Sequence, residues 1–165
     1  MFINNDIILI RHGKNIINES MPNDLLPLSP LGIKQAYYVK EYLKGKFDIV
    51  FCSNSYRSIM TARIINNNYI IDSRLIERGW GNVEKDGLET NEEAKQRFIS
   101  FLSENIIKYP NKRFLLVTHG SLIKIAQNII ENNIVECERV GNCMIFDYHI
   151  RDNKILRKNI HKCII

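Results

Sequence analysis

Residues 6–13 read DIILIRHG, in which four consecutive apolar residues lead directly into Arg11, His12 and Gly13. A short continuous apolar run is typical of a strand buried on both faces of a sheet. The glycine lets the backbone turn sharply and approach a ligand closely. We therefore predict a buried strand over residues 6–10 whose carboxyl end presents a guanidinium beside an imidazole.

The same pattern occurs twice more along the chain. Residues 47–52 (FDIVFC) lead into Ser53, and residues 113–118 (RFLLVT) lead into His119 and Gly120. Between these runs, apolar residues recur at helical spacing, and helix start and stop signals flank them. The predicted helices cover residues 29–44, 55–66, 91–109 and 121–132, with a short strand at 69–71 and a hairpin of residues 144–150 and 154–158.

Strands that alternate with helices predict an α/β fold. We expect a three-layer sandwich in which a mostly parallel central sheet has helices on both faces. Ligands bind such sheets at the carboxyl ends of the strands. The residues that follow the three buried runs are therefore the candidates for a functional site.

Length and composition predict a single domain over residues 1–165. Hydrophobic residues make up 45% of the chain and charged residues 25%, which argues against disorder and against a fibrous repeat. No apolar run is long enough to form a membrane-spanning helix, and the N-terminus lacks the features of a signal peptide. Four cysteines at irregular spacing are typical of reduced thiols, so we expect a cytoplasmic protein.

The formal net charge of +5 could indicate nucleic acid, anionic lipid or an anionic small molecule as the partner. Most lysines and arginines are scattered along the chain. The one cluster, residues 151–162, has no interleaved aromatic residues on which bases could stack, and we interpret it as a solvated tail. We therefore expect no nucleic-acid partner and no membrane partner.

The strand ends predict a cluster of cationic groups. Arg57 falls on the first turn of the helix that follows the second buried run, where a forked guanidinium and helix amides suit a phosphate group. Together with Arg11, His12 and His119 it would place two arginines and two histidines at one edge of the sheet. Such groups repel one another when protonated, so we expect an anion to bind between them and the imidazole of His12 to stay neutral.

A carboxylate should lie near this cluster to supply a proton. Glu77, in the segment LIERGWG, is the candidate. The alternative is a surface carboxylate that pairs with Arg74 or Arg78.

These residues resemble the histidine phosphatase superfamily, the phosphoglycerate mutase-like group, in order along nearly the whole chain. The tripeptide Arg11-His12-Gly13 alone would be a weak signal, but several ordered elements with suitable spacing make a specific one. The other matching positions are Asn18, residues 28–36 (LSPLGIKQA), residues 53–62 (SNSYRSIMTA), residues 75–78 (LIER), residues 117–120 (VTHG) and Asn142.

The resemblance implies covalent phosphoryl transfer without a metal ion or another cofactor. His12 would attack phosphorus with one ring nitrogen while a backbone carbonyl holds the other. Glu77 would protonate the leaving group and then activate water. The substrate and its phosphoryl oxygens would be bound by Arg11, Asn18, Arg57, His119 and Gly120.

Some positions depart from the family pattern. Lys14 and Asn15 stand where the family usually has Glu or Gln and then Thr or Ser, and Lys85 replaces a common glycine. Only 41 residues separate Glu77 from His119, which leaves little room for the lid that a mutase needs to exclude water. We therefore favour hydrolysis over isomerisation.

The favoured function is a compact phosphatase, monomeric or homodimeric, that acts on a small phosphorylated metabolite. A phosphoprotein phosphatase, for example one that acts on phosphohistidine, is the alternative, and a mutase is a lesser one. A non-catalytic phosphate-binding module is disfavoured because His12 and Arg57 are both present. Trp80 either lines the substrate pocket or covers the core, and the sequence leaves this open.

Overall fold

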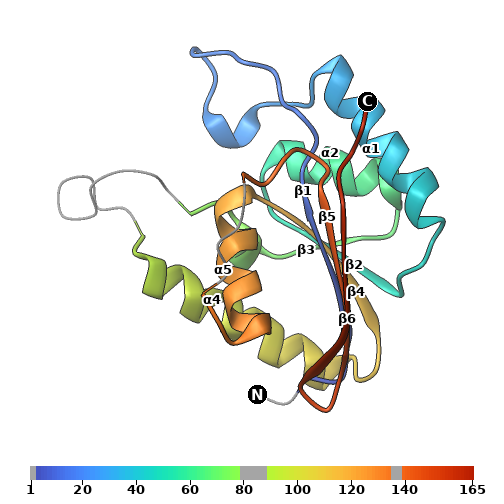
Figure 1. Ribbon diagram of the computed structural model, residues 1–165. Coiled ribbons are helices and arrows are strands. Elements are labelled where there is room, and N and C mark those ends of the chain that lie inside the picture. Colours follow the sequence, from blue (N-terminus) through green and yellow to red (C-terminus); the bar gives the residue numbers. More distant parts are fainter. Residues whose placement is uncertain (1–2, 79–88, 135–138) are drawn as a thin grey trace.

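A six-stranded sheet lies at the centre of the computed structural model, which describes residues 3–78, 89–134 and 139–165 (Figure 1). The strand order is β3-β2-β4-β1-β5-β6. β1 pairs in parallel with β4, and β2 pairs in parallel with both β3 and β4. β5 pairs antiparallel with both β1 and β6. The strands are β1 (Asp6–Arg11), β2 (Ile49–Cys52), β3 (Ile70–Ile71), β4 (Arg113–Thr118), β5 (Ile145–Arg151) and β6 (Lys154–His161). The predicted mostly parallel sheet is confirmed.

Helices cover both faces of this sheet (Figure 1). One hydrophobic cluster joins one face of the strands to α4 (Asn91–Lys108) and α5 (Gly120–Glu131). A second cluster joins the other face to α1 (Pro30–Leu43) and α2 (Tyr56–Ile65). Alternate residues of β1 enter different clusters, Ile7 and Leu9 the first, Ile8 and Ile10 the second. The three-layer sandwich is therefore confirmed, and its cause is the period-two alternation of strand side chains.

Local sequence signals explain where these elements begin and end. The Ser29 side chain accepts a hydrogen bond from the N–H of Gly32 and so caps the start of α1. Thr90 and Glu93 form a capping box on α4. Asp152 and Asn153 both have positive φ, the conformation of a two-residue hairpin turn, and they join β5 to β6 as predicted.

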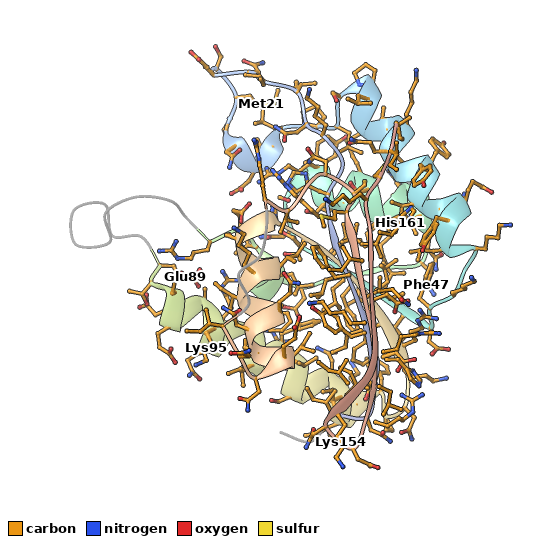
Figure 2. All side chains as sticks on the ribbon, viewed as in Figure 1. Met21, Phe47, Glu89, Lys95, Lys154 and His161 are labelled. Atoms are coloured by element: carbon orange, nitrogen blue, oxygen red, sulfur yellow. The ribbon has the colours of Figure 1, made fainter. Side chains whose placement is uncertain are left out.

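The structure differs from the sequence prediction at two kinds of position. Single 3-10 turns at Asn23–Leu25 and Ser73–Leu75 lie in segments for which no element was predicted. The cluster of basic residues at the C-terminal end is not a tail, since β6 extends to His161. Lys154, where β6 begins, lies at the opposite end of the molecule from Met21, which belongs to the loop after β1 (Figure 2).

Two predictions concern residues that the structure does not describe. Trp80 and Lys85 both lie outside the described residues, so the choice between pocket and core for Trp80 stays open and the effect of Lys85 stays untested. No helix of the described ranges is long and apolar enough to cross a membrane.

The loop after β1 packs tightly against the start of α1. A Cβ on Gly13 would lie 2.5 Å from the carbonyl oxygen of Gly32, and a Cβ on Gly32 would overlap the backbone of Lys14. The Lys14 carbonyl accepts hydrogen bonds from both the N–H and the hydroxyl of Ser29, and the Lys14 N–H donates to Gln35. The segment LSPLGIKQA thus holds the loop that begins with His12.

We expect Gly32→Ala to lower the free energy of unfolding by about 2 kcal/mol, because the new methyl group collides with the backbone of Lys14. Urea denaturation measures this change. Gly141→Ala is the control, since a Cβ there meets nothing within 4 Å, and it should change stability by less than about 0.5 kcal/mol. Equal stability of the two variants would contradict the close packing.

Candidate active site

The carboxyl ends of β1 and β4 bring two histidines together. Arg11 pairs with Thr118 in the parallel register, so His12 and His119 follow side by side, and the N–H of His12 donates to the Thr118 carbonyl. The two imidazole rings have centroids 5.0 Å apart and an interplanar angle of 64°. His12 is 2% exposed and His119 is fully buried. The predicted convergence of the two strand-end histidines is therefore present.

Arg57 lies in the first turn of α2 and bridges the two rings. Its Nε donates to Nε2 of His12 at 3.1 Å, and its Nη2 lies 3.4 Å from Nδ1 of His119. Its Nη1 donates to the carbonyl of Asn23, in the first 3-10 turn, at 2.6 Å. Only 3% of Arg57 is exposed, so this guanidinium is held in place on three sides.

The contacts of His12 determine which ring nitrogen carries the proton. Nδ1 lies 2.8 Å from the carbonyl oxygen of Gly13, and a carbonyl can only accept, so Nδ1 must be the protonated nitrogen. Nε2 then has a free lone pair, which accepts from Arg57. The backbone carbonyl contact implied by the family resemblance is present. Asn142 donates from its side-chain amide to the carbonyl of His12 and so holds the residue from the other side.

Burial keeps both imidazoles neutral. Desolvation is the main cause that lowers the pKa of His12 to about 3, the Gly13 hydrogen bond opposes it, and the charges of Arg57 and Arg11 add to it. Burial also lowers the pKa of His119 well below its usual value, and the neighbouring His12, Arg57 and Arg11 contribute in the same direction. The lone pair on Nε2 of His12 is therefore available at neutral and mildly acidic pH.

Buried serines orient His119. Its Nε2 lies 3.0 Å from Oγ of Ser53 and 3.3 Å from Oγ of Ser55. The hydroxyl of Ser55 also donates to Ser58. In the sequence, Ser53 and Ser55 are noted only as part of the segment 53–62. In the structure, their hydroxyl groups position His119.

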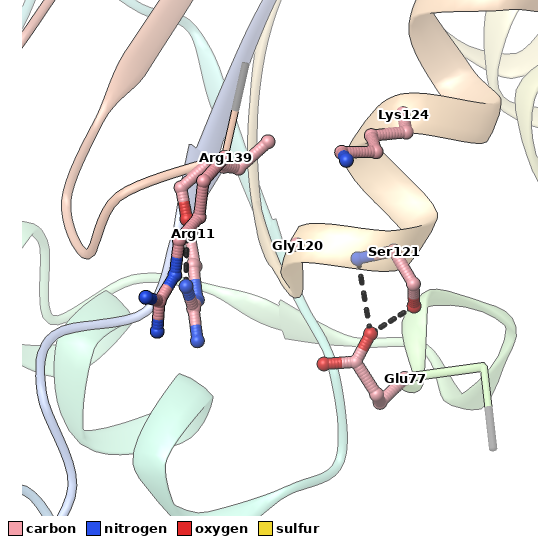
Figure 3. Close-up of a pocket in the computed structure, with 7 residues that line it drawn as sticks. Arg11, Glu77, Gly120, Ser121, Lys124 and Arg139 are labelled. Atoms are coloured by element: carbon pink, nitrogen blue, oxygen red, sulfur yellow. Dashed lines mark hydrogen bonds between the residues drawn. The ribbon is translucent and has the colours of Figure 1, made fainter. Parts of the chain in front are cut away.

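Glu77 lies at the N-terminal end of α5, opposite Arg11 (Figure 3). Its Oε1 accepts hydrogen bonds from the backbone N–H and the hydroxyl of Ser121, and its Oε2 lies 3.6 Å from Nδ1 of His119. Arg74 pairs with Asp72 and Glu104 instead. The side chain of Glu77 is 22% exposed, so it borders the site and can still exchange protons with water.

Arg11 forms the opposite wall of the site. Its Nη1 donates to the Val140 carbonyl at 2.6 Å, while its buried Nε has no hydrogen-bond partner among the described residues. A cavity of about 310 Å³ opens between Arg11 and Glu77, and Gly120 also lines it. The guanidinium thus has donor capacity left for an anion that enters this cavity.

Asn18 lies apart from these groups. It is exposed in the loop that follows β1, and its side-chain oxygen accepts from the N–H of Ser20. No described contact joins Asn18 to His12 or Arg57, so its role in substrate binding stays a prediction. Among the described residues, no group of three or more His, Cys, Asp or Glu side chains is placed to hold a metal ion.

Comparison with known proteins decides the family. The family model of the histidine phosphatase superfamily (branch 1) matches residues 7–96, more than half of the chain. The chain belongs to this superfamily. This membership confirms the family predicted from the sequence and, with it, the class of enzyme, a phosphomonoester hydrolase.

Individual relatives agree with this membership. An uncharacterized phosphatase of Bacillus subtilis, PhoE, is 30% identical over 140 residues, which cover 71% of this chain and 72% of that protein. A putative phosphoserine phosphatase 2 of Hydrogenobacter thermophilus is 33% identical over 116 residues, 63% of this chain. The chain spans only 55% of the length of that second relative.

Solved structures show the same fold. Phosphoserine phosphatase from Entamoeba histolytica superposes with a TM-score of 0.75 at 21% identity, over 98% of this chain and 100% of that one. A mycobacterial glucosyl-3-phosphoglycerate phosphatase gives a TM-score of 0.77 at 19% identity, over 94% and 96% of the two chains. Both matches extend over nearly the full length of the two chains, and the single domain over residues 1–165 stays a prediction.

The buried neutral histidines make stability depend on pH. The unfolded chain takes up protons on these rings below about pH 6.5, whereas the folded chain, with a His12 pKa of about 3, does not. Acid therefore favours the unfolded state. We expect the free energy of unfolding to fall between pH 7.5 and pH 5, with about 2 kcal/mol of the loss due to His12 alone.

Urea denaturation at both pH values, without phosphate in the buffer, measures this dependence. His12→Ala should reduce the loss by about 2 kcal/mol, because the variant has no ring to protonate at this position. His149→Ala, which changes an imidazole paired with Asp6 on the surface side of β5, is the matched control. The same pH dependence in wild type and His12→Ala would contradict the burial of a neutral ring.

Proposed function

We propose that this chain hydrolyses small phosphomonoesters through a phosphohistidine formed on Nε2 of His12. The observation that supports this most directly is the pair of contacts on the His12 ring. The Gly13 carbonyl fixes the proton on Nδ1, and the free lone pair on Nε2 faces Arg57. A neutral imidazole whose lone pair is directed at a guanidinium is suited to attack a phosphoryl group held there.

In the first step, Nε2 of His12 forms a bond to phosphorus and the bond from phosphorus to the ester oxygen breaks. The side chains of Arg11, Arg57 and His119 surround the phosphoryl oxygens and stabilise the charge that develops on them. Arg57 must turn its Nε–H from the imidazole toward an oxygen when the phosphate arrives. The positive charge on the phosphorylated ring is balanced by the phosphoryl group itself.

Glu77 carries the protons in both steps. As a carboxylic acid it gives its proton to the leaving oxygen, and an alcohol departs. As a carboxylate it then takes a proton from a water molecule, whose oxygen bonds to phosphorus while the nitrogen–phosphorus bond breaks. Free phosphate leaves, and the lone pair returns to Nε2 of His12. The hydrogen bonds from Ser121 hold the carboxyl group in place for this exchange.

The proposed reaction uses no metal ion, because the arginine cations neutralise the phosphoryl charge. Asn18 would join them if the loop that follows β1 moved toward the substrate. The small cavity beside Arg11 suits a small phosphorylated metabolite better than a folded phosphoprotein.

We further propose a cytoplasmic monomer or homodimer with no nucleic-acid or membrane partner. The three described cysteines, all free, agree with a reducing compartment.

We expect p-nitrophenyl phosphate to be hydrolysed in the presence of EDTA between pH 5 and 8, and His12→Ala to abolish this turnover. Since the pKa of His12 is lowered to about 3, its protonation should not limit the rate anywhere in this range. Acid-labile phosphate on the wild-type enzyme, trapped during turnover, would identify the intermediate. His149→Ala is the control that removes a histidine elsewhere and should keep activity.

Each contrary result has a definite meaning. Turnover that survives His12→Ala would contradict the nucleophile, and turnover lost to EDTA would contradict a metal-free reaction. No turnover of any small phosphomonoester by wild type would contradict the proposed function and favour the phosphoprotein phosphatase or the binding module.

The proton role of Glu77 predicts a dependence on the leaving group. Glu77→Gln should slow hydrolysis of an alkyl phosphate such as glycerol 3-phosphate by about 10²- to 10⁴-fold. It should slow the first step with p-nitrophenyl phosphate far less, because p-nitrophenolate leaves without a proton. Burst kinetics with both substrates separate the two steps. An equal loss for both leaving groups in the first step would contradict the role of proton donor.

A further inference from the structure

The cavity beside Arg11 is strongly cationic. Among the described residues, its lining includes three cations, Arg11, Lys124 and Arg139, and one carboxylate, Glu77. Figure 3 shows Arg11 and Arg139 close together on one wall, and Lys124 extends from α5 on the other wall toward them. Burial lowers the pKa of Arg11, and the charge of Arg139 lowers it further while Glu77 raises it. The charges of Arg11 and Arg139 therefore repel each other across this wall.

Lys124 and Arg139 have no carboxylate within ion-pair distance in the described ranges of the chain. Other cations of the molecule do have such partners: Arg74 pairs with Asp72, Arg97 with Glu89, and Lys158 with Glu131. The one carboxylate of the cavity is already held by Ser121. A second anion from outside would relieve the repulsion between these cations.

The proposed chemistry determines what lies in this cavity. Glu77 can protonate the leaving oxygen only if the leaving group lies against it, and Glu77 lines this cavity. Ser121, which holds Glu77, and Lys124 are three residues apart on α5, so their side chains lie on the same face, one turn apart. A leaving group that passes Glu77 therefore meets Lys124 next, with Arg139 on the facing wall.

We propose that Lys124 and Arg139 form a subsite for a second anionic group, a carboxylate or a second phosphate, on the alcohol part of the substrate. This inference rests on the proposed function, because it takes Glu77 as the group that protonates the leaving oxygen. It narrows the substrate class from phosphomonoesters in general to those with a negative charge a few bonds from the ester oxygen. Arg139 and Lys124 are then specificity residues that touch the substrate away from the reacting atoms.

Matched substrates test the subsite. O-Phosphoserine and O-phosphoethanolamine differ by one carboxylate, and fructose 1,6-bisphosphate and fructose 6-phosphate differ by one phosphate. We expect wild type to have a higher kcat/KM for the doubly anionic member of at least one pair, by about tenfold, the size expected for one charge-assisted hydrogen bond. The pair that shows the larger ratio identifies the second anion as carboxylate or phosphate.

Variants assign this preference to the two cations. Lys124→Gln and Arg139→Gln should each lower the ratio of kcat/KM within the preferred pair by about tenfold, mainly through KM. Lys124→Arg should restore most of it. Lys40→Gln, the same change of charge on the exposed face of α1, is the control and should keep the wild-type ratio.

The results separate this inference from the proposed function. Equal kcat/KM within both pairs, or ratios that Lys124→Gln and Arg139→Gln leave unchanged, would overturn the subsite while His12-dependent turnover of p-nitrophenyl phosphate still supported the hydrolase. Loss of that turnover in EDTA, or its survival in His12→Ala, would instead overturn the proposed reaction.

Discussion

The contact between Arg57 and His12 governs the chemistry of this molecule. A guanidinium and an imidazole are both buried, and they share a hydrogen bond in which arginine keeps its proton and histidine stays neutral. The proton stays on arginine because the pKa of a guanidinium lies far above that of an imidazole. The site consequently has a fixed positive charge and a neutral imidazole nitrogen 3.1 Å apart. An enzyme that binds a phosphate dianion needs the positive charge, and one that attacks phosphorus needs the neutral nitrogen.

The remainder of the fold supports this pair at a cost in stability. A buried guanidinium without a carboxylate partner costs stability. Among the described residues, Arg57 contacts the Asn23 carbonyl and the two imidazole rings instead. The loop of His12 is fixed from three directions: by Gly32 of α1, by Thr61 of α2, which accepts from the N–H of Gly13, and by Asn142 ahead of β5. Elements from both halves of the chain therefore converge on His12, and a change in any of them can loosen its position.

The sequence predicted the layers and the strand-end residues because these follow from local pattern. Continuous apolar runs such as residues 7–10 and 114–117 have to be buried on both faces, and the residue after each run has to lie at the edge of the sheet. The parallel register then places His12 beside His119. Ser121, Lys124 and Arg139 could not be found in this way, since their positions depend on how α5 and the segment before β5 lie across the cavity. The 3-10 turn that contacts Arg57 has no periodicity to reveal it, and the site of Asn18 depends on the conformation of an exposed loop.

The described elements around the cavity indicate which side chains could contact a leaving group. Of the 41 residues between Glu77 and His119, α4 uses 18 and β4 a further 6, and both pack into the core. Besides Arg11 and Glu77, the described residues that line the cavity belong to the first turns of α5 and to the segment just before β5. Under the proposed function, specificity that depends on a single side chain of α5 can change through one substitution there, because Gly32 and Thr61, which support the loop of His12, belong to α1 and α2. The same fold can thus accept different phosphomonoesters while its reacting groups stay in place.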